Sequence, residues 1–329
     1  MANTALELQT LILTSLQYVL YSRFKTRVVA RLMVNSTPTD PRYVHATVVV
    51  NNNLYVMGGF SNSRSSREFF SLDLSQPFDA TNPQWKDLTT TSPLPVLISW
   101  ATASSNTKND TIFLFGGSMV DTATGVYNFK SVVYTHDLKT NQWLANPPAF
   151  QGMAPERRRE FSSVSDPLTG KLYIHGGAND MKVTTIVIFK DFFTLDGDTL
   201  SWKLIGTAAL NMPSPRIDHA SVLIDNGIIV FIGGRESLTA DTWNLMTIVG
   251  GPVVDSRTGH TAVYANGKVI VYGGSTTMQD TTPIPELVVL DTTTKPFKWI
   301  TPPVTTPEVP INSVTCHKAN LIGNYMVVI

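Results

Sequence analysis

The chain has 329 residues, 43% of them apolar, and its 25 basic and 25 acidic side chains cancel. This length exceeds the usual size of a single hydrophobic core, which favours several smaller packed units. Only 15% of the residues are charged, so a basic footprint for nucleic acid and an acidic tail are both lacking, and no nucleic-acid partner is expected. The single cysteine, Cys316, excludes an intramolecular disulfide and a thiolate zinc cage.

The first 35 residues differ from the rest of the chain. Residues 6–21 carry polar side chains at three- and four-residue steps opposite a leucine face, a pattern that predicts an amphipathic helix. The segment is too polar and short for a membrane span, so membrane contact through it is not expected. A signal peptide or signal anchor is the alternative, but Glu7 precedes the apolar stretch and basic residues follow it. A cytoplasmic location is slightly favoured, and a secreted or anchored one stays open. Two glycosylation sequons, at residues 35–37 and 109–111, matter only in the secretory case.

Five glycine pairs, each closing a short apolar run, recur after this segment. Their first glycines are 58, 60, 57 and 40 positions apart. A period of this size indicates that a repeated structural unit has to be explained. The pairs are Gly58-Gly59, Gly116-Gly117, Gly176-Gly177, Gly233-Gly234 and Gly273-Gly274.

Two further markers accompany each pair. About 13 to 16 residues upstream lie His45, Trp100, Phe161, His219 and His260. All but Trp100 have an arginine three residues earlier, at Arg42, Arg158, Arg216 and Arg257. A tryptophan follows the first glycine by 27, 27, 26, 10 and 26 residues, at Trp85, Trp143, Trp202, Trp243 and Trp299. Between pair and tryptophan, β-branched and aromatic runs end in an aspartate suited to a turn.

Each unit therefore reads as four antiparallel strands, in the order strand, strand with glycine pair, strand with aspartate, and strand beginning at tryptophan. Such a unit has two apolar faces, so the units are expected to stack around a central axis as a propeller. The glycine pair suits the crowded end of an inner strand, where a side chain would collide or the backbone needs positive φ. The tryptophan is large enough to wedge between neighbouring units.

The glycine pair, the spaced tryptophan and the Arg-x-x-His segment resemble the kelch motif of the galactose oxidase/kelch propeller superfamily. The resemblance covers about residues 40 to 329. It implies an all-β propeller with five recognisable blades and a partial sixth, in which His317 and residues 325–329 match the first two strands. The fourth blade is expected to have three strands, because only 10 residues separate Gly233 from Trp243.

The short fourth repeat and the partial sixth suggest a truncated or alternatively spliced chain, or an imperfect gene model. A real, compact variant is the alternative. We expect residues 1–35 to be a helical or closing segment and residues 36–329 to form the propeller, incomplete at its C-terminus. Residues 26–35 could add a strand to the blade begun by residues 314–329, which would remove a free edge. An extension of the N-terminal helix is the competing interpretation.

The resemblance implies a binding role, because most kelch propellers are interaction modules and a minority are enzymes. Galactose oxidase-like enzymes hold copper with two histidines and two tyrosines, one of them cross-linked to cysteine. Here His45, His219, His260 and His317 occupy a repeated position, which indicates a structural role. The Glu-x-x-x-Asp-x-x-x-His array of the iron-dependent specifier proteins does not occur. We therefore predict no catalytic residue, metal or cofactor.

The predicted function is a non-catalytic scaffold for a protein partner, with a glycan as a further candidate ligand. The runner-up is a galactose oxidase-like or degenerate extracellular carbohydrate-active protein. Binding residues tend to lie on variable loops, here those between second and third strands. The candidate contacts are Arg64, Arg67, Tyr127, Phe129 and Met181, together with Arg157 and Arg159, and solvated or locally packed side chains are the alternative for each. Arg158 is expected to be structural, and Trp100 is interpreted as a core aromatic that replaces the repeated histidine.

Overall fold

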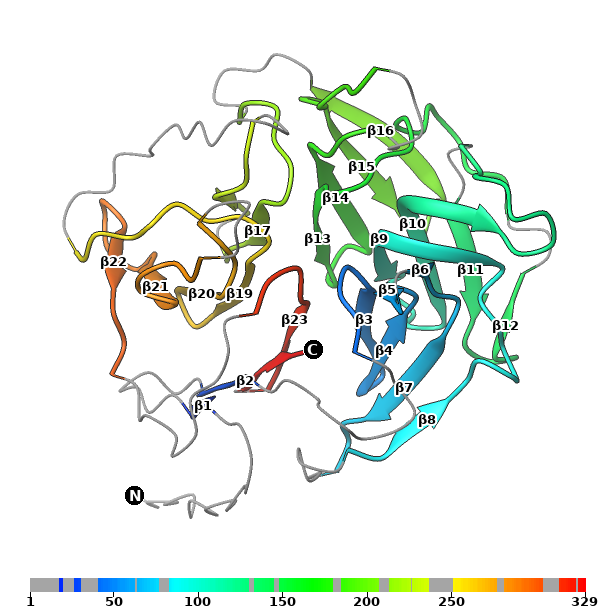
Figure 1. Cartoon of the computed structure of the whole chain (residues 1–329), viewed down its shortest axis with the longest axis horizontal. Helices are drawn as coiled ribbons and strands as arrows, with labels where there is room; N and C mark the ends of the chain where they lie inside the picture. The colour runs from blue at the N-terminus through cyan, green and yellow to red at the C-terminus, as the bar shows by residue number, and fades with distance from the viewer. Residues whose placement is uncertain are drawn as a thin grey trace.

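The structure, a computed structural model, describes the chain from residue 18 to residue 329 with gaps. The described residues are 18–19, 27–30, 41–62, 64–76, 83–129, 133–144, 148–179, 185–206, 213–225, 227–236, 251–276, 281–303, 314–323 and 325–329. Every regular element among them is a β-strand, in agreement with the all-β propeller that the repeats predict (Figure 1). No helix in this part of the chain is long and apolar enough to span a bilayer.

Six sheets correspond to the repeats, and they are numbered 1 to 6 in the order in which the repeats follow one another along the chain. Sheet 1 consists of β3 (Ala46–Val50), β4 (Asn53–Met57), β7 (Phe69–Asp73) and β8 (Trp85–Asp87). Sheet 2 consists of β9 (Val96–Ser105), β10 (Thr111–Asp121), β11 (Val133–Asp137) and β12 (Gln142–Trp143). Sheet 3 consists of β13 (Ser162–Asp166), β14 (Lys171–His175), β15 (Phe192–Asp196) and β16 (Ser201–Gly206).

The remaining sheets complete the circuit. Sheet 4 consists of β17 (Ala220–Leu223) and β18 (Ile229–Ile232). Sheet 5 consists of β19 (Thr261–Ala265), β20 (Lys268–Tyr272), β21 (Leu287–Asp291) and β22 (Lys298–Ile300). Sheet 6 consists of β23 (Ala319–Ile322), β24 (Tyr325–Val328), β2 (Arg27–Ala30) and β1 (Tyr18–Val19). A short hairpin, β5 (Phe60–Ser61) with β6 (Arg64–Ser65), projects from sheet 1.

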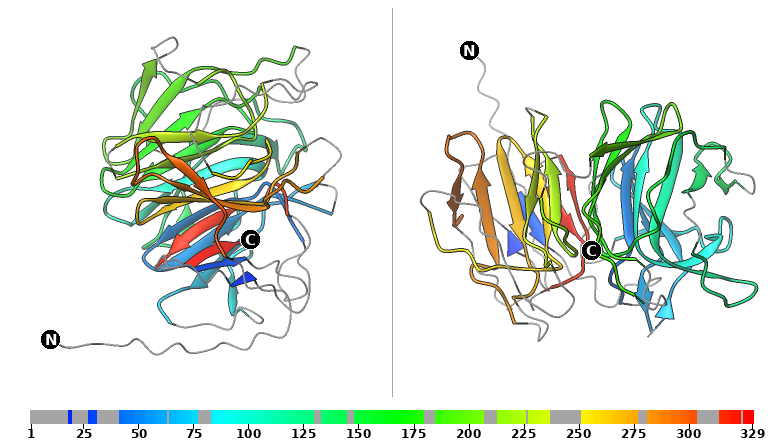
Figure 2. Two further views of the ribbon diagram at one scale, coloured as in Figure 1. Left: turned by 90° about the vertical axis from the view of Figure 1, so that its left-hand side faces the viewer. Right: turned by 90° about the horizontal axis from the view of Figure 1, so that it is seen from above.

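The sheets stand around a common axis, and the first strand of each lies nearest to it. These first strands contact their counterparts in the neighbouring sheets, from β3 and β9 round to β23 and β3. The tryptophan strands β8, β12, β16 and β22 lie at the outer edges (Figure 1). The side views in Figure 2 show the strands running from one face of the ring to the other. This arrangement is a β-propeller, and the predicted strand order within the units is confirmed.

The second strand of sheet 5 is covered on both faces. In β20 every residue from Lys268 to Tyr272 is buried, including Lys268, whose ammonium group pairs with Asp291. Strands buried on both faces read as continuous apolar runs rather than as alternating patterns. This explains why the runs before the glycine pairs were the clearest signal in the sequence.

The glycine pairs sit where the sequence places them, and the pair in sheet 3 shows why. Gly176 and Gly177 have φ angles of 69° and 87°. A Cβ on Gly176 would lie 2.3 Å from the carbonyl oxygen of Arg216 in sheet 4, and one on Gly177 would lie 2.6 Å from the Cβ of Phe161 in its own sheet. Positive φ and close approach of a neighbouring sheet therefore both apply.

Apolar clusters join the sheets, and the tryptophans take part in them. Trp202 of sheet 3 is 5% exposed, and its ring centroid lies 4.9 Å from that of Phe115 in sheet 2. Trp143 of sheet 2 makes the corresponding contact with Phe69 of sheet 1, at 5.7 Å. Tryptophan therefore wedges against the preceding sheet, as predicted. The seam between sheets 3 and 4 contains His175, His219, Phe192 and Phe231.

Two short strands near the N-terminus join the sheet formed by the C-terminal strands. Strand β2 pairs in parallel with β24, with Val28 opposite Met326, so the strand interpretation of residues 26–35 holds for Arg27–Ala30. Strand β1 extends the same sheet. Tyr18 and Val19 lie inside the range predicted as a helix and form a strand instead, because pairing with β2 satisfies their backbone groups. The rest of residues 6–21 lies outside the described part.

The fourth repeat cannot be compared in full with its neighbours. Sheet 4 has two antiparallel strands, β17 and β18, among the described residues. Residues 237–250, which include Trp243, lie outside the described part, so the expected third strand stays a prediction.

Candidate functional site

Six residues in the left-handed conformation encircle the axis, each of them within or just before the first strand of its sheet. They are Val44, Trp100, Glu160, Asp218, Gly259 and Cys316, with φ angles of 51° to 64°. Backbone N–H groups link five successive pairs: Trp100 to Val44 (2.7 Å), Val44 to Cys316 (2.8 Å), Cys316 to Gly259 (2.7 Å), Gly259 to Asp218 (3.0 Å) and Asp218 to Glu160 (2.9 Å). The links fix how each sheet follows the last, and we call the end of the axis that these six residues surround the axial mouth.

This ring corrects the sequence interpretation of Trp100. In sheets 1, 4, 5 and 6 the ring residue directly precedes the repeated histidine, which we call the leading histidine, as Val44 precedes His45. Trp100 shares the left-handed conformation of Val44, so Ala101 takes the histidine position in sheet 2. Trp100 is half-buried rather than a core aromatic.

The four repeated arginines hold each sheet's own glycine pair. Each donates from Nη1 to the carbonyl of the first glycine: Arg42 to Gly58 (3.0 Å), Arg158 to Gly176 (3.1 Å), Arg216 to Gly233 (3.0 Å) and Arg257 to Gly273 (3.3 Å). Arg158 is 1% exposed, pairs with Asp191 at 2.5 Å and lies over the ring of Phe189, 4.1 Å from its centroid. These contacts anchor the loop between the second and third strands.

The rings of the leading histidines occupy the space that a side chain would take at a glycine of the preceding sheet. The Cε1 atom of His219 lies 3.0 Å from the position of a Cβ on Gly176, in the preceding sheet. Phe161, His260 and His317 have the same relation to Gly116, Gly233 and Gly273. Burial lowers the pKa of His260 and of His317 to about 3. The repeated histidines are thus neutral packing groups between sheets.

The glycine pairs, the loops after them and the axial ring all lie at one end of the strands, which we call the doublet face. One part of this face is aromatic. Tyr43 is 43% exposed, and its ring lies 5.4 Å from that of Phe60, which lies 6.3 Å from that of Trp100. The backbone of Phe60 bridges to Tyr43, so the first two rings belong to one sheet and the third to the next. Together they form a half-exposed apolar patch across the seam of sheets 1 and 2.

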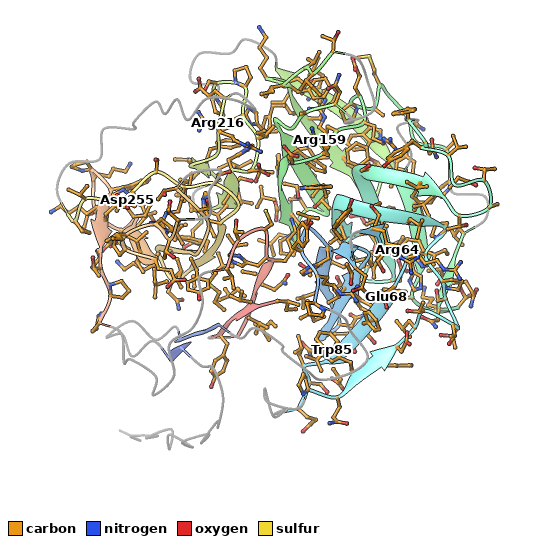
Figure 3. All side chains as sticks on the ribbon, in the orientation of Figure 1. Arg64, Glu68, Trp85, Arg159, Arg216 and Asp255 are labelled. Atoms are coloured by element: carbon orange, nitrogen blue, oxygen red, sulfur yellow. The ribbon has the colours of Figure 1, made fainter. Side chains whose placement is uncertain are left out.

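The opposite part of the axial mouth is ionic. Arg235 Nη2 lies 3.0 Å from Asp218 Oδ2 and 3.8 Å from Glu160 Oε2, and Arg159 pairs with Glu160. Burial raises the pKa of Asp218, and the guanidinium of Arg235 counteracts part of that shift. Two carboxylates thus face two guanidiniums, and Lys318 adds a further positive charge beside Asp218. Figure 3 labels Arg159 of this cluster.

The sequence analysis did not select several of these residues, although they occupy equivalent positions in different repeats. Phe60 and Arg235 both directly follow a glycine pair, and Glu160 and Asp218 both directly precede the leading aromatic or histidine. Comparing the repeats column by column at these two positions would have singled them out. Only Arg159 of this cluster was a candidate.

The structure separates the predicted contact residues. Arg64 and Arg67 are exposed on or beside the β5–β6 hairpin, and Phe129 is 50% exposed. Tyr127 is half-buried and stacks with Phe129, their centroids 6.4 Å apart. Met181 lies outside the described residues.

Arg157 and Arg159 need a correction, since neither is displayed to solvent on a loop. They are 6% and 4% exposed. The guanidinium of Arg157 lies 5.6 Å from the ring centroid of Phe129, and Arg159 pairs with Glu160. The local partners of this charged run explain the burial, because a buried guanidinium requires compensating contacts.

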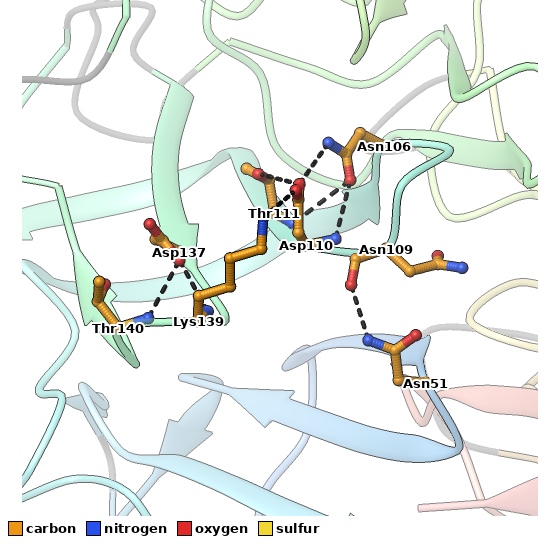
Figure 4. A network of polar contacts seen from close by, with 8 residues as sticks. All are labelled: Asn51, Asn106, Asn109, Asp110, Thr111, Asp137, Lys139 and Thr140. Carbon is orange, nitrogen blue, oxygen red and sulfur yellow. Dashed lines mark hydrogen bonds and ion pairs between the residues drawn. The ribbon is translucent and has the colours of Figure 1, made fainter.

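Turns occupy the opposite end of the strands. Figure 4 shows one such site, where Asn51 donates to the backbone carbonyl of Asn109 (2.7 Å) and so joins sheets 1 and 2. Asn106 Nδ2 and Lys139 Nζ donate to the carboxylate of Asp110, at 2.8 and 3.0 Å. These hydrogen bonds, that of Asn106 first, lower the pKa of Asp110 to about 2. The polar groups at this end are engaged in holding turns.

Among the described residues, no three His, Cys, Asp or Glu side chains gather as a metal-ligand group. The six histidines are buried between strands, including His136, which bonds to Ser92 Oγ at 3.1 Å. What the doublet face offers is contact area, a largely buried ionic cluster and exposed guanidinium groups.

The fold and the repeated contacts define the class: the chain is a kelch-type β-propeller. It belongs to the Attractin/LZTR1 beta-propeller family, whose model matches residues 9–243.

Relatives and a solved structure agree with this assignment. The chain is 25% identical over 251 residues to Kelch-like protein terF of Aspergillus terreus, covering 69% of this chain and 50% of that protein. It is 22% identical over 278 residues to Multiple epidermal growth factor-like domains protein 8 of Mus musculus, covering 78% and 9%. The solved structure of YjhT matches with a TM-score of 0.57 and 16% identity, covering 83% of this chain and 87% of that one. The chain spans half or less of the length of these curated relatives.

Proposed function

We propose that this chain is a non-catalytic scaffold that binds a protein partner through the doublet face. The observation that carries the proposal is the half-exposed patch of Tyr43, Phe60 and Trp100 at the axial mouth. Trp100 shares the left-handed backbone of the other ring residues, with φ at 57°, and its N–H bonds to Val44 of sheet 1, so its position across the seam is fixed.

Loops of sheets 2, 3 and 5 add apolar side chains to the same face. Val126 and Phe129 of sheet 2 are 61% and 50% exposed, Val187 of sheet 3 is 47% exposed, and Ile284 of sheet 5 is 72% exposed. Apolar side chains gathered on one face of a rigid scaffold are typical of protein-binding surfaces, whereas scattered ones need no explanation. A partner that contacts the axial mouth would also contact these surrounding side chains.

The same proposal includes a ring of six blades, with residues 1–35 as the closing segment and residues 36–329 as the propeller. The pairing of β2 with β24 supports the closure, because it places an N-terminal strand in the sheet begun by the C-terminus. A closed ring leaves no free sheet edge at its seam and makes the doublet face a rigid platform.

Photo-crosslinking from the two ends of the strands tests the function. A photoreactive phenylalanine analogue at Phe129 lies on the doublet face, and the matched control at Leu168, 89% exposed, lies on the opposite hairpin between β13 and β14. Irradiation in an extract of the source cells should give a discrete crosslinked protein from Phe129 and several-fold less of it from Leu168. Equal yields from both positions, or no crosslinked protein from either, would contradict the proposal.

A further inference from the structure

We propose that one corner of the doublet face, formed by Arg64, Arg67, Tyr43, Phe60 and Trp100, binds an acidic segment that also carries an aromatic or large aliphatic side chain. This inference rests on the proposed protein-binding function and names the chemistry of the partner. We call these five residues the arginine–aromatic corner.

The corner is held in place by backbone contacts across the seam of sheets 1 and 2. Ser66, which follows β6, donates its N–H to Gly59 O at 2.8 Å and accepts from the N–H of Ile98 at 2.9 Å. The hydroxyls of Ser65 and Ser99 lie 3.0 Å apart. The hairpin that carries Arg64 is thus fixed against β9 before any partner arrives, which limits the entropy lost on binding.

The charge of the corner is positive and uncompensated. Arg64 and Arg67 are exposed, and neither has an ion-pair partner among the described residues. The nearest acid along the chain, Glu68, is already engaged by Arg42 Nη2 at 2.6 Å and by Ser66 Oγ at 2.9 Å. Guanidinium groups bind carboxylates through paired hydrogen bonds, so these two side chains favour acidic residues.

The aromatic rings supply the other half of the recognition. Phe60 lies between Tyr43 and Trp100, and none of the three belongs to the apolar clusters that join the sheets. Their half-exposed rings offer a platform for an apolar side chain of the partner, and burial of such rings accounts for much of the binding energy at interfaces.

The arginine–aromatic corner is a stronger candidate site for an acidic segment than the ionic cluster on the same face. Arg235 pairs with Asp218, and Arg159 pairs with Glu160, so these four charges compensate one another, and Lys318 beside Asp218 is a cation whose pKa burial lowers. The corner instead carries two exposed guanidinium groups, Arg64 on the same hairpin as Phe60 and Arg67 just after it. An acidic segment is therefore steered to the corner rather than to the ionic cluster.

A selection from a random library of peptides, with the purified full chain as bait, tests the inference. The enriched peptides should share two or more Asp or Glu residues next to Trp, Phe, Tyr or Leu. A synthetic peptide of the enriched sequence should bind at least about tenfold more weakly to the double variant Arg64→Glu, Arg67→Glu. Its affinity for the wild-type chain should fall as salt is raised.

The matched control is the double variant Lys108→Glu, Lys203→Glu, which makes the same charge change at exposed positions outside the corner and should bind as the wild type does. Arg64→Gln, Arg67→Gln replaces the charge-reversed variant if that one fails to fold. No enrichment, peptides without acidic residues, or unchanged affinity in both arginine variants would overturn the inference. Non-acidic peptides that lose binding in Phe60→Ala would overturn it while leaving the proposed function standing.

Discussion

Acidification below pH 6.5 is expected to unfold this chain over a narrow pH range. All six histidines are buried, none more than 7% exposed. Burial lowers the pKa of His136 and His175 to about 4 and those of His260 and His317 to about 3, and holds those of His45 and His219 well below 6.5. Nearby cations such as Arg257 beside His260 act in the same direction.

The sign follows from the state that binds more protons. Below pH 6.5 the unfolded chain protonates its histidines, whereas the folded chain keeps them neutral until about pH 4 or lower. The contribution of each histidine is therefore fully present above pH 6.5 and is lost as pH falls toward the folded pKa. Each can remove up to about 1.4 kcal/mol per pH unit, and six together about 8 kcal/mol per unit, against a typical stability of about 5–15 kcal/mol.

Urea unfolding followed at pH 7.5, 6.5, 5.5 and 5.0 measures the effect. The free energy of unfolding should fall by about 2 kcal/mol between the first two, because each histidine of the unfolded chain is half protonated at pH 6.5, and it should fall more steeply below them. His260→Phe provides a matched variant, because Phe161 fills the same position in sheet 3. This variant should lower the slope of the unfolding free energy against pH by the equivalent of up to one bound proton. A stability that stays level down to pH 5 would show that the histidines are not held neutral.

Replacing Trp202 by alanine should destabilise the chain by about 3–5 kcal/mol. The side chain is 5% exposed and packs on Phe115 of the neighbouring sheet, so its removal leaves a cavity at the seam between sheets 2 and 3. Chemical denaturation at pH 7.5 measures the loss.

The control for this variant is Leu168→Ala, at a position 89% exposed, which should stay within about 0.5 kcal/mol of the parent. If Trp202→Ala unfolded at the same denaturant concentration as the parent, the side chain would not wedge between sheets.

The strand order was predictable because each strand carries its own local marker. A glycine pair is required where positive φ coincides with a neighbouring sheet, and Asp73 shows the turn role of the repeated aspartate by accepting the N–H of Ser75 at 2.8 Å. The pairing of β2 with β24 was one of two open interpretations, because a single short strand at the end of a chain has weak periodicity.

The candidate site was harder to predict, because its contacts join different sheets. Trp100 was assigned to the wrong position because the spacing from the glycine pair varies between repeats, and only the backbone conformation identifies its column. The charged run around Arg157 and Arg159 looked exposed, yet Phe129 of another loop lies against Arg157, and Arg159 pairs with the adjacent Glu160. Arg64 and Arg67 lie on the surface where the sequence placed them, and their binding role stays a prediction.

Hydrogen–deuterium exchange of the chain, with and without the partner that photo-crosslinking isolates, tests most directly whether the doublet face binds a protein. Protection is predicted in peptides that cover residues 58–68 and 119–129, which contain the β5–β6 hairpin and the loop that follows Met119. Peptides that cover the opposite hairpins, residues 105–111 and 166–171, should exchange at unchanged rates. Protection confined to those opposite hairpins would contradict the account.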